Sequence, residues 1–222
     1  MEVSENKYWF LRNHQLFRTL ANSEVEDLCI VSRFIVAKKK DFIYLANDDI
    51  PRIYLLKIGM IRIVEMENGK ETIKDIIRQG DLFGEISLSK SGSKTEMAQA
   101  MSKEVSICSF RLEDFENVLA KNSQIALTYT KMVGEKMKNI SNRYSGLVFR
   151  DVRSRLIAFL KDWAATEGVK DGNNIRIKNY LTHSDIAGII CSTRQTVTEL
   201  INDLEYQRKL TYTRSEVVLK DL

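Results

Sequence analysis

The spacing of apolar residues changes character about halfway along the chain. From about residue 30 to residue 110, apolar residues form short runs, several of them separated by turn residues at 47–49, 57–59 and 67–69. These runs are Phe34–Val36, Phe42–Tyr44, Ile53–Leu56, Ile61–Val64, Thr72–Ile77 and Val105–Phe110. Short runs at this interval predict a small antiparallel β-barrel or sandwich.

After Leu112 the apolar spacing lengthens to between three and four residues, which is the period of a helix. A helix is predicted over residues 123–148, and apolar side chains form one stripe along it: Val133, Met137, Ile140, Tyr144 and Leu147. Such a stripe can belong to the core of a single chain. Its regular steps, with polar and basic residues beside it, instead favour pairing with the same helix of a second subunit. We therefore expect a homodimer with this stripe at its interface.

Residues 149–152 interrupt the stripe, and Asp151 is placed to cap a new amphipathic helix. The apolar positions of that helix are Leu156, Ile157, Phe159, Leu160 and Trp163. Beyond it the sequence predicts a loop over 168–174, a short strand over 175–177, and a closing hairpin of strands 210–212 and 217–219 turned at 214–216. The interruption is therefore the predicted domain boundary.

Residues 181–207 predict two short helices joined by a tight turn, the helix-turn-helix arrangement. Thr182 and Asp185 have the spacing of a capping box at the start of the first helix. Ala187 provides the small side chain that a close helix crossing needs. The apolar positions expected to bury the two helices are Ile186, Ile190, Val197 and Leu200. With the hairpin that follows, this region predicts a winged helix-turn-helix.

The start of the second helix is rich in hydrogen-bond donors and poor in aliphatic surface. Side chains of this kind suit phosphates and base edges in the major groove of DNA. The residues predicted to bind DNA are Thr182, His183, Ser192, Thr193, Arg194, Gln195, Thr198 and Glu199. Two alternatives stay open, because an ordinary helical hairpin has the same apolar spacing and a winged domain can contact protein instead of DNA.

The composition is that of an ordinary globular protein. The chain has 222 residues, of which 44% are hydrophobic and 29% charged, and this length is comfortable for two domains. No apolar run approaches the roughly 18 residues of a membrane span, and the N-terminus lacks a secretion signal, so we expect no membrane contact and a cytoplasmic protein. The net charge of +4 and the pI near 8.8 are only mildly basic, so DNA affinity must come from local placement of charge.

The residues that could carry catalysis or bind metal are few and scattered. The cysteines Cys29, Cys108 and Cys191 lie far apart, without the spacing of a zinc or iron–sulfur site, and we expect them to be reduced and buried. His14 and His183 are the histidines of the chain. Because no Ser/His/Asp or Cys/His set converges, the sequence predicts no catalytic residues, no metal and no enzyme.

Three motifs give the chain a family resemblance once the β-domain, the striped helix and the winged domain stand in this order. They are Gly80–Glu85 in the β-domain, Phe149–Val152 at the boundary, and Ser192–Thr198 at the start of the second short helix. Together they resemble bacterial transcription regulators of the cyclic-AMP receptor protein/FNR (CRP/FNR) family over nearly the whole chain. The third motif particularly resembles the nitrogen-control branch of that family.

The resemblance implies an α+β fold with three parts. Residues 1–122 would form a double-stranded β-roll of the cyclic-nucleotide-binding type, residues 123–148 a long dimerisation helix, and residues 149–222 a winged helix-turn-helix. It also implies a homodimeric, sequence-specific DNA-binding transcription regulator, controlled through the β-roll. Its expected partners are double-stranded DNA, a second copy of the chain and RNA polymerase. The alternative is a small-molecule sensor whose winged domain contacts protein.

The effector site departs from the pattern of the cyclic-AMP-binding members. Gly84 and Glu85 match the pair that, in those members, cradles the phosphate and binds a ribose hydroxyl. Downstream, the family pattern Arg-Ser/Thr-Ala is replaced by Lys94, Thr95 and Glu96, so a point charge replaces the forked guanidinium and a negative charge is added. We therefore expect that cyclic AMP is not bound in the usual way.

A second departure lies on the long helix. Ile140, followed by Ser141, stands where cyclic-AMP binders present a Thr to the adenine, and an aliphatic side chain cannot make that hydrogen bond. The candidate effector residues are Gly84, Glu85, Lys94, Thr95, Ile140 and Ser141, for an unidentified small-molecule effector. A β-roll turn that is kept without any ligand remains the other interpretation.

The resemblance also implies roles on the second short helix. Arg194 matches the Arg that reads a base in the family, and Gln195 stands where many members carry a Glu that accepts from cytosine. Glu199 replaces an Arg that points at DNA in the receptor protein. Cys191 stands where many such turns carry Gly, so a left-handed backbone there would cost about 1 kcal/mol.

Overall fold

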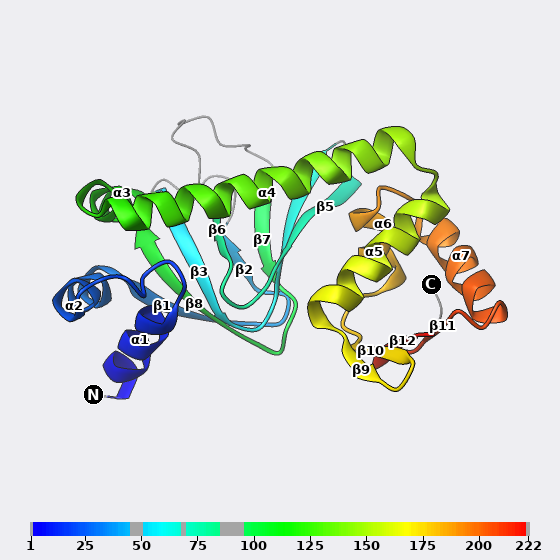
Figure 1. Cartoon of the computed structure of the whole chain (residues 1–222), viewed down its shortest axis with the longest axis horizontal. Helices are drawn as coiled ribbons and strands as arrows, with labels where there is room; N and C mark the ends of the chain where they lie inside the picture. The colour runs from blue at the N-terminus through cyan, green and yellow to red at the C-terminus, as the bar shows by residue number, and fades with distance from the viewer. Residues whose placement is uncertain (1, 45–50, 68–69, 85–95, 221–222) are drawn as a thin grey trace. The chain divides into compact units, whose positions relative to one another are not determined.

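The computed structural model describes residues 2–44, 51–67, 70–84 and 96–220, and the chain divides into two compact units (Figure 1). The first unit comprises residues 1–70 and 74–137, and the second comprises residues 71–73 and 138–222. The long helix α4, Ser123–Phe149, contributes residues to both. Within the described residues, no helix is both long enough and apolar enough to cross a lipid bilayer.

The first unit is built around two four-stranded sheets. One has the order β1-β8-β3-β6, formed by Arg33–Lys38, Glu104–Arg111, Arg52–Ile58 and Leu82–Gly84. The other has the order β2-β7-β4-β5, formed by Phe42–Tyr44, Glu96–Ala100, Ile61–Glu67 and Lys70–Ile77. The β1-β8, β3-β8, β3-β6, β2-β7 and β4-β7 pairs are antiparallel, so the predicted antiparallel β-domain is confirmed.

Strand β3 is buried on both faces, which explains its uninterrupted apolar run. Tyr54 and Leu56 pack in a cluster with apolar residues of the second sheet, whereas Ile53 and Leu55 pack in a cluster with residues of the helices. Successive side chains of a strand point to opposite faces, so a central strand covered on both sides carries apolar residues on both faces. The β1-β8-β3-β6 sheet is therefore the middle layer of the first unit.

Helices cover the outer face of that middle sheet. They are α1 (Glu2–Asn13), α2 (Asn22–Val31) and α3 (Leu112–Lys121), followed by the start of α4. Leu11, Phe17 and Leu28 from the N-terminal segment and Phe115 from α3 are almost fully buried in one cluster. The sequence did not predict α1 and α2, nor the short strands β6 and β7.

The second unit begins with α5, Val152–Glu167. The predicted cap is confirmed, because Asp151 Oδ1 accepts a hydrogen bond of 2.7 Å from the backbone N–H of Ser154. Of the predicted apolar positions of α5, three are buried and two are half-buried: Leu156, Leu160 and Trp163, then Ile157 and Phe159. This face packs over a four-stranded sheet of order β11-β12-β10-β9.

That sheet corrects one prediction. Its strands are β9 (Val169–Asp171), β10 (Asn174–Lys178), β11 (Leu210–Tyr212) and β12 (Glu216–Leu219). The loop predicted over 168–174 is wrong in part, because β9 lies within it and pairs with β10. Gly172, at φ +61°, forms the tight turn between these two strands, which made the segment resemble a loop.

Candidate functional site

The two helices of the predicted helix-turn-helix are α6, His183–Ile189, and α7, Arg194–Tyr206. The capping box at the start of α6 is present, with the Asp185 N–H donating to Thr182 Oγ1 at 3.2 Å and the Thr182 N–H donating to Asp185 Oδ2 at 2.8 Å. Helix α7 is capped by Thr193, whose Oγ1 accepts from the Thr196 N–H at 3.1 Å. Each helix start is therefore fixed by a local side-chain hydrogen bond.

The turn between the helices is tight and left-handed at one residue. Cys191 has φ +52°, and the Ser192 N–H donates to the Ala187 carbonyl at 2.9 Å. An L-residue with a Cβ is strained in this region. The small side chain of Ala187 is 4% exposed, as expected for the crossing. The backbone at Cys191 sets the direction in which the chain enters α7.

The buried apolar positions of α6 and α7 differ from the prediction at one residue. Ile186, Ile190 and Val197 are buried as predicted, but Leu200 is only half-buried, and Ile201 is buried in its place, followed by Leu204. Two neighbouring aliphatic residues fit the helical period almost equally well, and the packing of α7 against α6 and β11 decides between them.

The first turn of α7 presents its polar side chains to solvent. Thr193, Arg194, Gln195 and Glu199 are exposed, and Ser192 and Thr198 are half-buried. Gln195 Nε2 donates to Glu199 Oε1 at 3.0 Å, so these two candidate DNA contacts pair with each other. Because the Arg194 side chain is exposed, it can contact a ligand without breaking a buried contact, whereas Gln195 must exchange its bond to Glu199 before its amide can bind elsewhere.

His183 and Thr198 are both half-buried and lie within hydrogen-bond distance of each other. His183 Nδ1 is 2.9 Å from Thr198 Oγ1, and the same hydroxyl donates to the Arg194 carbonyl at 2.9 Å. Because a hydroxyl has one hydrogen to give, the proton on the ring belongs on Nδ1. The pKa of His183 is lowered, mainly by burial and also by the positive charge of Arg194. The negative charge of Glu205 acts in the opposite direction. The His183 ring donates from Nδ1 to Thr198 Oγ1 and so helps to orient that hydroxyl.

Sequence reasoning missed two arginines of α5 that contact the ends of α7. Arg153 forms an ion pair with Asp203 near the C-terminal end of α7, and its Nη2 donates to Gln207 Oε1 at 3.2 Å. Arg155 donates to backbone carbonyls of the turn before α7. The sequence shows only that basic residues follow the Asp151 cap. Their position along the chain does not indicate which groups the two guanidinium groups contact.

The candidate effector residues are described only in part. Glu85, Lys94 and Thr95 lie outside the described residues. Gly84 ends β6 at φ +97°, where an added Cβ would approach the Arg52 carbonyl oxygen to 2.7 Å and the Tyr54 ring to 2.6 Å. A glycine is therefore required at this position by the packing of β6 against β3, whether or not a ligand binds beside it.

Glu96, at the start of β7, has a local partner for its charge. Its Oε2 lies 3.3 Å from Lys74 Nζ, which also pairs with Glu65 at 3.1 Å. Burial lowers the pKa of Lys74, but the hydrogen bond to Glu65 and the charge of Glu96 outweigh it, so that the pKa is raised. Lys74 offsets part of the negative charge that distinguishes this segment from the family pattern.

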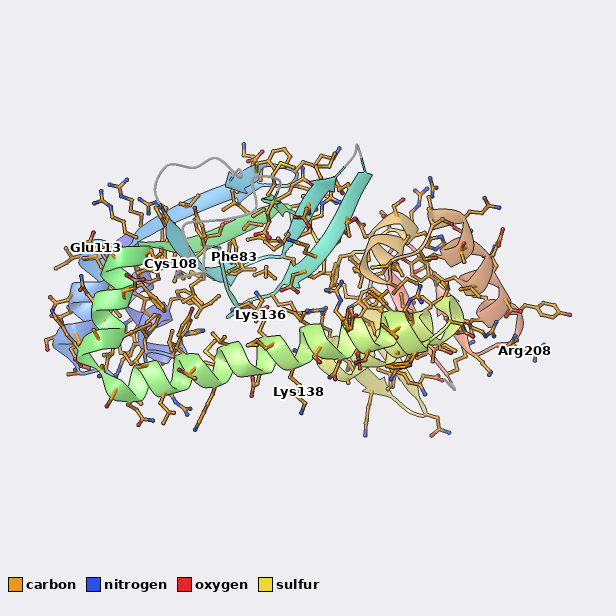
Figure 2. The ribbon with its side chains drawn as sticks, turned by 90° about the horizontal axis from the view of Figure 1, so that it is seen from above. Phe83, Cys108, Glu113, Lys136, Lys138 and Arg208 are labelled. Atoms are coloured by element: carbon orange, nitrogen blue, oxygen red, sulfur yellow. The ribbon has the colours of Figure 1, made fainter. Side chains whose placement is uncertain are left out.

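The predicted stripe on α4 is largely exposed in the single chain. Met137, Ile140 and Tyr144 are 66%, 59% and 68% exposed, Leu147 is exposed too, and Val133 is half-buried. Ser141, the other candidate on this helix, is also exposed. Figure 2 shows Lys136 and Lys138 on opposite sides of α4, and Lys136 Nζ lies 3.3 Å from Asp75 Oδ2. The apolar stripe of α4 therefore has little cover within one chain.

The cysteine prediction is wrong for two of three residues. Cys108 is buried, and burial raises the pKa of its thiol to about 11, but Cys29 is half-buried and Cys191 is exposed. All three are free thiols. Across residues 2–44, 51–67, 70–84 and 96–220, no three His, Cys, Asp or Glu side chains come together as a group that could hold a metal ion.

Comparison with known proteins covers both units. A family model described as "Cyclic nucleotide-binding domain" matches residues 34–122, and one described as "Crp-like helix-turn-helix domain" matches residues 154–222. The chain is 26% identical over 179 residues to the "Global nitrogen regulator" of Nostoc sp., covering 80% of each chain. It is 24% identical over 171 residues to the "CRP-like cAMP-activated global transcriptional regulator" of Mycobacterium tuberculosis, covering 77% of this chain and 76% of the relative.

Solved structures give the same result for the fold. A CooA mutant from Carboxydothermus hydrogenoformans has a TM-score of 0.75 and 29% identity, covering 87% of this chain and 85% of that one. The "c-di-GMP Responsive Global Regulator CLP" of Xanthomonas campestris has a TM-score of 0.73 at 15% identity, covering 91% and 100%. The β-roll, the long helix and the winged helix-turn-helix are thus shared with proteins of very different sequence.

Proposed function

Because the chain belongs to the CRP/FNR family, whose members are DNA-binding transcription regulators and not enzymes, we propose that it binds DNA as a homodimer through the first turn of α7. The proposed DNA contacts are Thr182, His183, Ser192, Thr193, Arg194, Gln195, Thr198 and Glu199. The single observation that carries this proposal is the exposed, donor-rich surface of Thr193, Arg194 and Gln195 at the capped start of α7. The N-terminus of a helix, with its backbone N–H groups and exposed polar side chains, suits phosphate and base edges.

The direct test of DNA binding is a gel shift of genomic fragments. The full chain should retard a subset of fragments in the presence of excess random duplex. If the winged domain contacts protein instead, no fragment should be retarded in preference to the random competitor. RNA polymerase is a proposed further partner of the bound dimer.

The homodimer would be held by α4. The proposed interface consists of Val133, Met137, Ile140, Tyr144 and Leu147, and the exposure of four of these side chains in one chain supports it. Large apolar side chains that recur along one face of an exposed helix mark a contact surface. Such a dimer would place two copies of α7 on successive turns of DNA, so that the α4 interface sets the half-site spacing.

The first unit would act as the sensor. We place the domain boundaries at residues 1–122 for the β-roll, 123–148 for the dimerisation helix and 149–222 for the DNA-binding domain. An effector in the β-roll would shift the paired α4 helices and change the angle of the winged domains across residues 149–152. This requires an effector that binds the two dimer states with different affinity. Native mass spectrometry of the purified protein would reveal a ligand that copurifies.

Cyclic AMP should bind weakly or not at all in isothermal titration calorimetry. The physical reason is that Lys94 lacks the bidentate grip of Arg on phosphate, Glu96 adds a negative charge, and Ile140 cannot hydrogen-bond to adenine. Relatives are named for different effectors, cAMP in Mycobacterium tuberculosis and c-di-GMP in Xanthomonas campestris, so the fold itself does not fix the ligand. Micromolar binding that Glu85→Ala abolishes would contradict this prediction.

Glu199→Arg should raise the affinity for random duplex DNA and steepen its salt dependence. The substitution removes a negative charge from the proposed DNA face and can add a phosphate contact, and each such contact steepens the slope of log K against log salt by about 0.9. It also releases Gln195 from its partner. The measurement is fluorescence anisotropy with random duplex across a salt series.

The matched control is Glu116→Arg, which makes the same charge change on the exposed surface of α3. Its salt slope should equal that of the native protein. Equal slopes for Glu199→Arg and Glu116→Arg would show that Glu199 does not face DNA.

A further inference from the structure

Arg155 lies one turn into α5 and donates to three backbone carbonyls from two separate segments of the chain. Its Nη1 donates to the Arg150 carbonyl at 2.8 Å, directly after the end of α4. Its Nε donates to the Ile190 carbonyl at 3.0 Å, and its Nη2 donates to the Cys191 carbonyl at 3.3 Å. One guanidinium therefore joins the end of α4 to the turn that precedes α7.

The carbonyls that Arg155 contacts lie at the C-terminal ends of helices, where carbonyls need a hydrogen-bond donor from outside the helix. The last carbonyls of a helix have no partner within the helix, and Ile190 and Cys191 stand at the C-terminal end of α6 while Arg150 follows α4. The negative ends of two helix dipoles thus meet at one site, where a cation is favourable. A guanidinium suits the site because its donors point in several fixed directions in one plane.

The contact with Cys191 matters because this residue directs the chain into α7. Cys191 has φ +52°, and two residues later Thr193 caps α7, with Arg194 as its first residue. A rotation of the Cys191 peptide would therefore swing the start of α7 and its exposed side chains. Arg155 holds the carbonyl of that peptide and its neighbour, so it limits such a rotation.

We propose that Arg155 is a positioning residue that keeps the turn between α6 and α7 in register with the end of α4, and thereby sets how sharply α7 discriminates between DNA sequences. The proposal rests on the proposed function, because it assumes that α7 reads DNA. A shift of the α4 end would be transmitted through the same guanidinium to the start of α7. Arg155 itself contacts backbone carbonyls and is not proposed to touch DNA.

The chain offers a matched control on the same helix. Arg153 contacts the other end of α7 through Asp203 and Gln207, so Arg153→Met also removes a guanidinium that links α5 to α7. It leaves the turn at Cys191 untouched. A role in stability alone would give similar results for the two variants, whereas a positioning role gives a loss of discrimination for Arg155 only.

The experiment compares the native protein with Arg155→Met, Arg155→Lys and Arg153→Met. Each protein is titrated with random duplex and with the duplex that the native protein selects from a random pool. The temperature is kept below the unfolding midpoint that circular dichroism gives for that protein. For Arg155→Met we expect the ratio of selected to random affinity to fall at least tenfold, with an unchanged salt slope on random duplex. Arg155→Lys keeps the charge but not the fork, so its ratio should fall by less, and Arg153→Met should keep the native ratio.

The possible failures are distinguishable. If the native protein shows no preference for any duplex, the proposed function fails and not the role of Arg155 alone. If the native protein discriminates and Arg155→Met discriminates equally well, the positioning role is overturned. It is also overturned if Arg155→Met weakens both duplexes equally and flattens the salt slope, because that is the behaviour of a direct phosphate contact.

Discussion

Ile140→Asp is expected to convert the protein from dimer to monomer in sedimentation velocity. In the dimer, each copy of the substitution would place an unpaired carboxylate in the proposed interface, which costs about 3–5 kcal/mol when the charge is fully buried. The dissociation constant should therefore rise at least about a hundredfold, since 1.4 kcal/mol corresponds to a factor of ten. Ile140 is 59% exposed in the single chain, so the monomer should keep its fold.

The control for this prediction is Asn142→Asp, which adds the same negative charge to an exposed position of α4 outside the stripe. This variant should remain a dimer. A native dissociation constant for Ile140→Asp would contradict the proposed interface, and dissociation of both variants would point to a general effect of charge on α4.

Arg194→Ala is expected to weaken binding to the selected duplex by about 1–3 kcal/mol per half-site, because an arginine can donate two hydrogen bonds to the O6 and N7 of one guanine. This corresponds to a loss of about five- to 150-fold for each half-site. Arg194 is exposed and is the first residue of α7, so its removal disturbs no buried contact of the side chain. Fluorescence anisotropy with the selected duplex measures the loss.

Arg33→Ala is the matched control, because it removes the same charge from an exposed position of β1 in the first unit. Its affinity for the selected duplex should stay within a factor of two or so of the native value, as surface substitutions usually have small effects. An equal loss in Arg33→Ala and Arg194→Ala would mean that net charge, and not a contact of Arg194, determines binding.

Gln195 leads to an expectation about the base that the half-site carries at the position it contacts. Gln prefers adenine, whereas the Glu found here in many family members accepts from cytosine, so the selected half-site should differ from the commonest family half-site at that step. The hydrogen bond from Gln195 to Glu199 must be exchanged when Gln195 contacts both adenine positions. The base preference at this step should therefore be weaker than the preference set by Arg194.

The sequence predicts the strands that have a strong apolar pattern. It misses the strands that form only because neighbouring strands pair with them. Residues 53–56 are apolar throughout, and residues 105–110 carry apolar side chains on both faces beside Ser106 and Ser109, because both segments lie in the middle layer. The sequence predicts both as strands. Glu96–Ala100 has Ala, Glu and Gln, which favour strands poorly, and it becomes β7 because β2 and β4 pair with it on both sides. Local propensity cannot reveal this.

The helix caps show the opposite case, in which local chemistry is sufficient. Asp151, Thr182 and Asp185 act within three residues of their own position, so their roles follow from spacing alone. The guanidinium of Arg155 acts across 35 residues to reach Ile190 and could not be predicted. The pairing of His183 with Thr198 spans two helices and was likewise visible only in the structure.

Repeated selection from a random duplex pool would show whether the first turn of α7 reads base edges. The selection is performed in parallel with the native protein and with Arg194→Ala, and the recovered sequences are compared position by position. We expect Arg194→Ala to lose the base preference at one position of each half-site and to keep the others. Recovery of the same preference at every position by both proteins would mean that Arg194 does not read a base.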